Sequence, residues 1–149
     1  MGGFFSQRRL ARFHRDERGG VLVEFALLAP LFFTLLIGVL QIGMQIQNWN
    51  AIRNLASDGA RFAVVEYQRG HASQADLIST WMRSRGAGSR YNLNTDRLGI
   101  TVTSQTSRIA DALEMQISVT YDAPDYLAFV PGNLLQIKYK RPVFLLKDS

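Results

Sequence analysis

The stretch from Gly19 to Ile46, GGVLVEFALLAPLFFTLLIGVLQIGMQI, decides the fold of this 149-residue chain. Between Phe25 and Leu40, only Pro30, Thr34 and Gly38 interrupt an otherwise apolar run, and none of them is charged. About 20 apolar residues at ~1.5 Å each cross the ~30 Å hydrocarbon core of a bilayer. The alternative is a buried helix of a soluble protein, but this run is too long and too apolar on every side. The sequence therefore predicts a transmembrane helix.

The segment before this run, residues 1–19, is basic. It carries five arginines against Asp16 and Glu17, a net charge of +3 out of +5 for the whole chain. On the other side of the run the first basic residues are Arg53 and Arg61, which are fewer and further apart. Positive charge favours the cytoplasmic side, so the N-terminus is predicted to be cytoplasmic and the C-terminal half exported. A secretory signal peptide is the competing interpretation, but its apolar core would be shorter and followed by a small-residue cleavage site.

Glu24 is the one ionisable side chain inside the apolar stretch. An ionised carboxylate there must be paired or bear the cost of its desolvation. In the simpler interpretation it is an acid near a helix N-terminus, favoured by the helix dipole and level with the lipid headgroups. In the functional interpretation the whole context counts: arginines, then Gly19-Gly20, then Val-Leu-Val, then Glu24-Phe25.

That context resembles the prepilin pattern, in which a dedicated aspartic peptidase cuts after a glycine. The run VEFALLAPLFFTLLIGVLQIG and the later ASDGARFAVV resemble the TadE-like proteins, minor pseudopilins of tight-adherence (Flp-type) pilus systems. The resemblance covers about residues 18–65. It implies cleavage between Gly19 and Gly20, with Glu24 and Phe25 as fifth and sixth residues of the mature chain. It also implies as partners the prepilin peptidase, a major pilin, a sister pseudopilin and the pilus assembly platform, at the bacterial inner membrane.

The helix is predicted to continue past the membrane to about Val65. Polar residues recur there at helical spacing, and a second face carries Trp49, Ile52, Ala56, Ala60 and Ala63. Pro30 removes one backbone donor and is expected to kink the helix. Such a long helix, half in lipid and half supporting a head, is the architecture that the resemblance to pilins implies. We therefore expect a leader at 1–19, a transmembrane and stalk helix at 20–65, and an exported head at 66–149.

The head is predicted to hold one helix and a three-stranded antiparallel sheet, which makes the fold class α+β. Gly70 ends the long helix, and Ser73 with Asp76 predicts the start of a second helix over about 74–85. Three segments then alternate apolar and polar residues, around 98–103, 114–121 and 135–140. Pro142 is expected at the end of the third strand or at a sheet edge. The apolar loop from Ala123 to Asn133 is expected to cover the core, with docking on a partner or a membrane as the alternative.

Catalytic and cofactor motifs are missing from the sequence. There is no cysteine, the two histidines are isolated, and no glycine-rich phosphate loop occurs. We therefore predict no catalytic residue, cofactor or metal site, and the basic residues of the head lack the clustering with aromatics that nucleic-acid binding needs.

The favoured function is thus a non-enzymatic minor pseudopilin that is itself the substrate of a peptidase. The alternative is a single-pass, membrane-anchored binding module unrelated to pili. Removal of the leader at Gly19 is expected only for the pseudopilin and therefore distinguishes the two functions.

Overall fold

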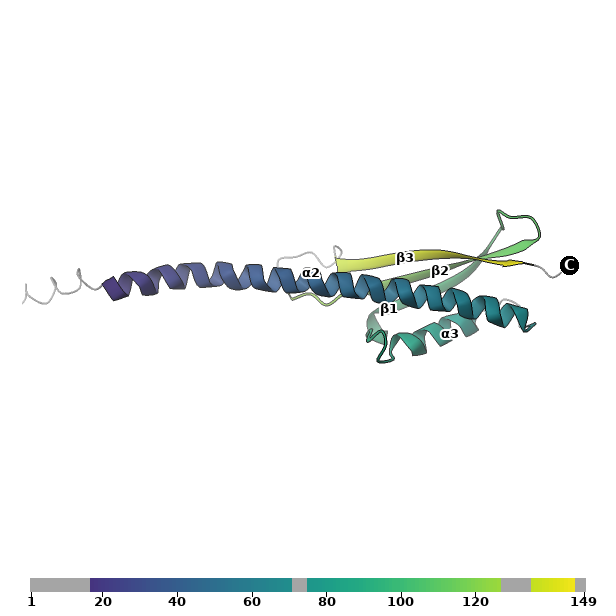
Figure 1. Cartoon of the computed structure of the whole chain (residues 1–149), viewed down its shortest axis with the longest axis horizontal. Helices are drawn as coiled ribbons and strands as arrows, with labels where there is room; N and C mark the ends of the chain where they lie inside the picture. The colour runs from purple at the N-terminus through teal and green to yellow at the C-terminus, as the bar shows by residue number, and fades with distance from the viewer. Residues whose placement is uncertain (1–16, 71–74, 127–134, 147–149) are drawn as a thin grey trace, which may run out of the picture. The chain divides into compact units, whose positions relative to one another are not determined.

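The computed structural model describes residues 17–70, 75–126 and 135–146 (Figure 1). Its elements in chain order are helix α2 (Glu17–Gln68), helix α3 (Ala75–Gly86), the 3-10 turn η1 (Thr95–Arg97), and strands β1 (Leu98–Gln105), β2 (Ala112–Asp122) and β3 (Gln136–Leu146). The predicted α+β fold, with a long apolar helix, a second helix and a three-stranded antiparallel sheet, is confirmed. The chain divides into two compact units, one up to Leu40 and one from Gln41 onward, and α2 contributes to both.

Helix α2 is longer at both ends than the sequence predicted. It begins at Glu17, inside the basic segment, and continues three residues beyond Val65. It ends where Gly70 adopts a positive φ of 81°, with its amide donating to the carbonyl of Tyr67 at 3.0 Å. That left-handed conformation is the one that glycine adopts without steric cost, so the predicted stop at Gly70 is confirmed. Pro30 lies inside the helix without interrupting it.

The apolar face predicted for the second half of α2 forms one wall of the core. Ile52 and Ala56 are fully buried, and Ala60 and Ala63 are exposed by 8% or less. Trp49 differs, because 41% of it remains exposed and its ring meets that of Tyr139 edge-on, with centroids 5.9 Å apart. The small alanines allow the neighbouring elements to approach α2 closely, whereas Trp49 lies at the margin of this contact.

Helix α3 lies within one residue of the predicted bounds at each end. Ile78 and Met82 are buried, and the ring of Trp81 stacks on that of Phe62 from α2 with centroids 4.4 Å apart. Leu77 of the same helix is 39% exposed. Ser73, the proposed cap, and His71 lie outside the described residues.

The strands run in the order β1-β2-β3, and all neighbours are antiparallel. Each strand is longer than the apolar alternation predicted, because backbone pairing continues through polar positions such as Ser104 opposite Met115. The prediction that the third strand ends at Pro142 is wrong: β3 continues to Leu146, and Pro142 pairs with Gln116. The alternative prediction, a position on a sheet edge, is confirmed, since β3 is an outer strand.

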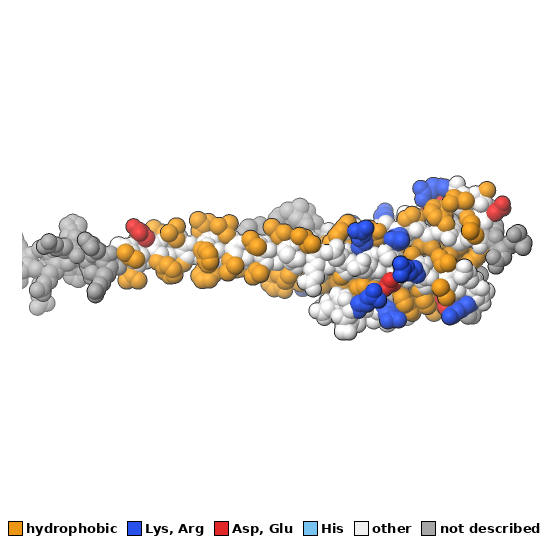
Figure 2. All heavy atoms as spheres, in the orientation of Figure 1, with side chains coloured by type: hydrophobic (Ala, Val, Ile, Leu, Met, Phe, Trp, Pro, Cys, Tyr) orange, Lys and Arg blue, Asp and Glu red, His pale blue; other side chains and the backbone are white. Residues whose placement is uncertain are grey.

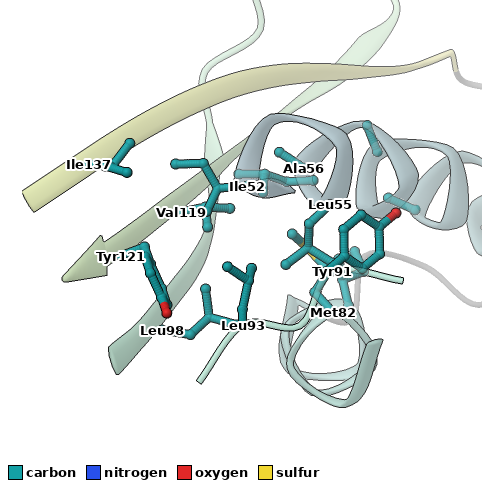
Figure 3. Close-up of a cluster of buried hydrophobic side chains, with 14 of the residues drawn as sticks. Ile52, Leu55, Ala56, Met82, Tyr91, Leu93, Leu98, Val119, Tyr121 and Ile137 are labelled. Atoms are coloured by element: carbon teal, nitrogen blue, oxygen red, sulfur yellow. The ribbon is translucent and has the colours of Figure 1, made fainter. Parts of the chain in front are cut away.

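The core lies between the two helices and one face of the sheet (Figure 3). Leu55 from α2, Met82 from α3 and Val119 from β2 are fully buried and meet in this cluster. Leu93 and Leu98 close it from the segment that leads into β1. Each fully buried side chain of this size stabilises the fold by about 1.5–3 kcal/mol relative to exposure. The head therefore holds together through contacts among all its elements.

Candidate functional site

The apolar surface of α2 in the first unit is the outstanding feature of the molecule. The large side chains of this segment that are more than half exposed are Val21, Leu22, Val23, Phe25, Leu27, Leu28, Leu31, Phe32, Phe33, Leu35, Val39 and Leu40. Hydrophobic groups line this stretch of α2 in the space-filling view (Figure 2). The helix reaches a mean hydropathy of 2.3, with 6% of its most apolar window buried. Contiguous exposure of this extent marks a contact with lipid or with other apolar helices.

The residues predicted for processing lie near the start of this helix. Gly19 and Gly20 are both helical and exposed, and a Cβ added to either would meet no atom within 4 Å. Packing inside this chain therefore does not require glycine at either position. Glycine lowers helix stability by about 1 kcal/mol relative to alanine, so two in succession make this turn easier to unwind. A peptidase that needs an extended substrate would meet little resistance here.

Glu24 and Phe25 follow on the same helix, and both are exposed. Glu24 is four residues after Gly20, so the two positions lie on one face, one turn apart. Phe25 is 67% exposed and, together with Leu28, Ala29, Phe32 and Phe33, lines a hollow of about 320 Å³. Ala29 is the one small residue of this lining among large ones, an arrangement into which a side chain of a neighbouring helix can pack.

Pro30 and Thr34 form a local pair in the same segment. The hydroxyl of Thr34 donates to the carbonyl oxygen of Pro30 at 2.8 Å. This bond satisfies the Thr34 hydroxyl within its own helix, as is required in a medium without water. The Thr34 hydroxyl is thus satisfied within its own helix, whereas the Glu24 carboxylate has no hydrogen bond or ion pair with the residues that the structure describes.

Two glutamines that the sequence interpretation did not single out mark the beginning of the second unit. Gln41, 6% exposed, donates from Nε2 to the carbonyl oxygen of Pro124 at 2.7 Å and accepts from the amide of Tyr126 at 3.3 Å. Gln45 donates to the carbonyl oxygen of Leu135 at 3.2 Å. They fix α2 to the segments that enter and leave the apolar loop. Ala123 is buried as predicted for this loop, whereas residues 127–133 lie outside the described part.

A second candidate surface lies on the head between α2 and α3. It is a hollow of about 360 Å³ whose walls carry four arginines and two acids, namely Asp58, Arg61, Glu66, Arg69, Arg85 and Arg90. Arg85 lies over the ring of Trp81, 5.2 Å from its centroid. Asp58 pairs with Arg90 at 3.5 Å and accepts a hydrogen bond from the Tyr91 hydroxyl. Burial, together with this hydrogen bond, raises the pKa of Tyr91 above its ordinary value.

The chemistry of these arginines is that of a solvated, internally paired cluster. Arg69 bonds Glu66 at 3.0 Å, and Arg90 is engaged by Asp58. Exposed pairs of this kind contribute little to stability. Among the described residues, no group of three or more His, Cys, Asp or Glu side chains is placed to hold a metal ion.

Comparison with known proteins identifies one family. The family model described as "TadE-like protein" matches residues 19–61, from the first glycine of the pair to the second half of α2. No curated protein and no solved structure matches the chain. The match begins at Gly19, the residue predicted to precede the cleaved bond, and covers the whole exposed apolar stretch. The resemblance that the sequence indicated is thus confirmed for residues 19–61, which are similar to the TadE-like family.

Proposed function

We propose that this chain is a minor pseudopilin that takes part in assembling or priming a tight-adherence (Flp-type) pilus. One observation carries the proposal: the TadE-like match coincides with a helix whose apolar side chains are exposed over the length of a bilayer. The helix anchors the chain as a single span in the bacterial inner membrane. The head acts by binding other proteins rather than by catalysis, and it uses no cofactor.

The first step of the proposed function is maturation. A prepilin peptidase cuts between Gly19 and Gly20, removes the basic leader and leaves residues 20–149. Support comes from the sequence context and from the exposure of both glycines on a turn with low helical stability. Because glycine has no side chain, it also lets the peptidase approach the backbone closely.

The second step is assembly through Glu24. Cleavage creates a positive α-amino group at Gly20, one helical turn from the Glu24 carboxylate. Glu24 neutralises this amine in its own chain or, when helices pack side by side, in a neighbouring pilin. Placing a charge in the membrane near the helix end costs less free energy than the ~2.5–3.5 kcal/mol found at a bilayer centre. Ion pairing between Glu24 and the amine therefore offsets this cost. Phe25 contributes to the same contact through the hollow around Ala29.

The proposed partners are those that the resemblance to the TadE-like family implies. The major pilin and a sister pseudopilin present apolar helices of the same kind, and the assembly platform receives the anchored chain in the membrane.

The arginine asymmetry around the apolar run favours an N-terminus in the cytoplasm and a head outside it. A reporter active only in the periplasm, fused after Ser149, should be active. Activity of a cytoplasmic reporter at that site would contradict this topology.

The experiment that tests the function replaces Glu24 in a strain that makes these pili. Glu24→Ala and Glu24→Gln should leave the chain in the membrane but lower both surface pili and co-purification with the major pilin at least tenfold. Thr34→Val is the matched control, because its hydroxyl is satisfied by Pro30 in the same helix. Normal pili after complete removal of the chain would exclude a role in assembly and favour a membrane-anchored binding module.

A further inference from the structure

Strand β3 runs beside the second half of α2 and in the same direction (Figure 1). Gln45 Nε2 donates to the carbonyl oxygen of Leu135, just before β3 begins. Further along both elements, Arg141 Nη1 donates to Ser57 Oγ at 3.0 Å. The first residues of β3 therefore lie beside the part of α2 that directly follows the apolar run.

A hollow of about 480 Å³ lies between the two elements at this end. Its lining comes from α2 and β3, namely from Gln45, Ile46, Trp49, Gln136, Ile137 and Lys138, and most of it is apolar. Ile46 is 58% exposed, and Trp49 is exposed as well. Large apolar side chains of the hollow are thus open to the surroundings, which suits the apolar part of a ligand.

The hollow lies at the height along α2 where lipid headgroups are expected. About 20 residues cross the hydrocarbon core, so a span that begins at Phe25, directly after Glu24, ends near Met44. At ~1.5 Å per residue, Ile46 and Trp49 then lie at most about 8 Å beyond that end. The polar layer of a bilayer adds about 5–8 Å on each side, so the hollow falls within it.

Aromatic side chains occur at the same height. Tyr126 is 56% exposed, and its amide is bonded to Gln41, the first polar residue after the apolar run. Trp49 follows on α2 and meets the ring of Tyr139. Tryptophan and tyrosine are enriched at membrane–water interfaces, because their rings are apolar and their N–H or O–H groups need a polar partner. Trp49 and Tyr126 both fit that environment.

Charge indicates which kind of lipid the hollow fits. Among the six lining residues only Lys138 is charged, and its side chain is exposed. No ion pair joins Lys138 to another residue in the part of the chain that the structure describes. The acid on the neighbouring strand, Asp122, accepts a hydrogen bond from Gln136 Nε2 at 2.8 Å. A lysine stem can lie along apolar surface while its ammonium reaches the polar layer, where it favours an anion.

We propose that this hollow binds an anionic phospholipid of the membrane in which α2 is anchored. The glycerol backbone and the upper acyl chains lie against Ile46 and Trp49, and the phosphate pairs with the Lys138 ammonium. The inference rests on the membrane anchoring that is part of the proposed function. It adds to that function a class of lipid and the residue that selects it.

A lipid is favoured over a helix of a partner protein by continuity and by charge. Exposed apolar side chains continue along α2 from the apolar run through Ile42 to Ile46. A lipid that borders the span therefore reaches the hollow without leaving the bilayer. An apolar helix brings no anion to Lys138, whereas a phospholipid carries its phosphate at this height.

The test uses the fluorescence of Trp49 in the full-length protein, reconstituted in vesicles of phosphatidylcholine and phosphatidylglycerol. Trp81→Phe removes the other tryptophan and keeps an aromatic ring against Phe62. A nitroxide on an upper acyl carbon, carried by either lipid at the same low fraction, quenches a tryptophan that touches that lipid. Labelled phosphatidylglycerol should quench Trp49 with an apparent affinity about fivefold that of labelled phosphatidylcholine, the ratio that one lysine near a membrane surface gives.

Charge variants on β3 identify the selecting residue. In the Trp81→Phe chain, Lys138→Gln should abolish the preference for phosphatidylglycerol, and Lys138→Arg should keep it. Lys140→Gln is the matched control and should also keep it, because Lys140 is an exposed lysine of the same strand outside the lining of the hollow. The Trp49→Phe chain reports Trp81 and should show no preference.

Two kinds of failure can be told apart. Equal quenching of Trp49 by the two lipids, or the same preference after Lys138→Gln as after Lys140→Gln, would overturn the lipid site and favour a partner protein as its occupant. The proposed function would be unaffected. No quenching of Trp49 by either lipid would overturn the lipid site and also contradict the anchoring of α2 in a membrane.

Discussion

Gln41 binds Pro124 across 83 positions of the sequence, with 2.7 Å between the Gln41 Nε2 and the Pro124 carbonyl oxygen. The same side chain accepts a hydrogen bond from the amide of Tyr126. It is the first polar residue after the apolar run, and it is buried. Gln41 therefore holds α2 against the segment leading into the apolar loop through two hydrogen bonds.

Gln41→Leu should destabilise the head. The substitution keeps the size of the side chain but leaves the Pro124 carbonyl and the Tyr126 amide without this partner, which costs about 1–3 kcal/mol for a buried polar group. Urea unfolding of the detergent-solubilised protein measures the change. Gln47→Leu is the control, because Gln47 lies on the exposed side of α2. Equal stability of the two variants would show that the Gln41 contacts do not hold the segment.

Met82→Ala should lower the free energy of unfolding by about 2–5 kcal/mol, the usual cost of truncating a buried large side chain. Met82 is fully buried between α3 and α2, where its side chain leaves no room for a Cβ at Gly59. Leu77→Ala on the same helix is the matched control and should cost far less, since Leu77 is 39% exposed. Thermal unfolding followed by circular dichroism distinguishes them. A similar loss in both variants would contradict the assignment of Met82 to the core.

The fold was predictable where the hydrophobic pattern is regular. The apolar run is nearly uninterrupted, and the alanine face from Ala56 to Ala63 and the alternation in β2 each have one period. All three were predicted in the elements where the structure has them. Strand ends were not predictable, since backbone pairing continues through polar residues. For Pro142 the sequence left a strand end and a sheet edge open, and the structure has the edge, because β3 is an outer strand that continues to Leu146.

The candidate site was predictable only in part. The family pattern from Gly19 to Phe25 is local, so its residues could be named from the sequence. Gln41 and Gln45 were missed because their partners, Pro124 and Leu135, lie far along the chain. Glu114 was missed although its partner, Arg108, lies only six residues away. It belongs to the polar face of β2, yet its side chain is 3% exposed because Arg108 covers it.

The Glu114–Arg108 pair should make stability depend on pH. Arg108 Nη2 lies 2.7 Å from Glu114 Oε1, and hydrogen bonds from the Arg108 guanidinium hold the pKa of Glu114 below its ordinary value. A carboxyl with a lowered pKa in the folded state stabilises the fold above its ordinary pKa. This stabilisation is lost as the pH falls through the lowered value.

Arg108→Gln should therefore be less stable than wild type at neutral pH, and the two proteins should converge only in acid below the lowered pKa of Glu114, where its carboxyl group is protonated. Urea midpoints at a series of pH values measure this difference. Arg97→Gln changes an exposed arginine of η1, so its urea midpoint should differ from that of wild type by the same amount at every pH. A gap between wild type and Arg108→Gln that stays unchanged into acid would contradict the role of the pair.

The intact mass of the protein isolated from cells with an active prepilin peptidase tests the central claim most directly. The account predicts a chain that begins at Gly20 and ends at Ser149. It also predicts that Gly19→Leu, which puts a bulky side chain before the bond, leaves the full 149-residue precursor uncut. A mature mass that includes Met1 or Gly2 in the wild type would contradict it.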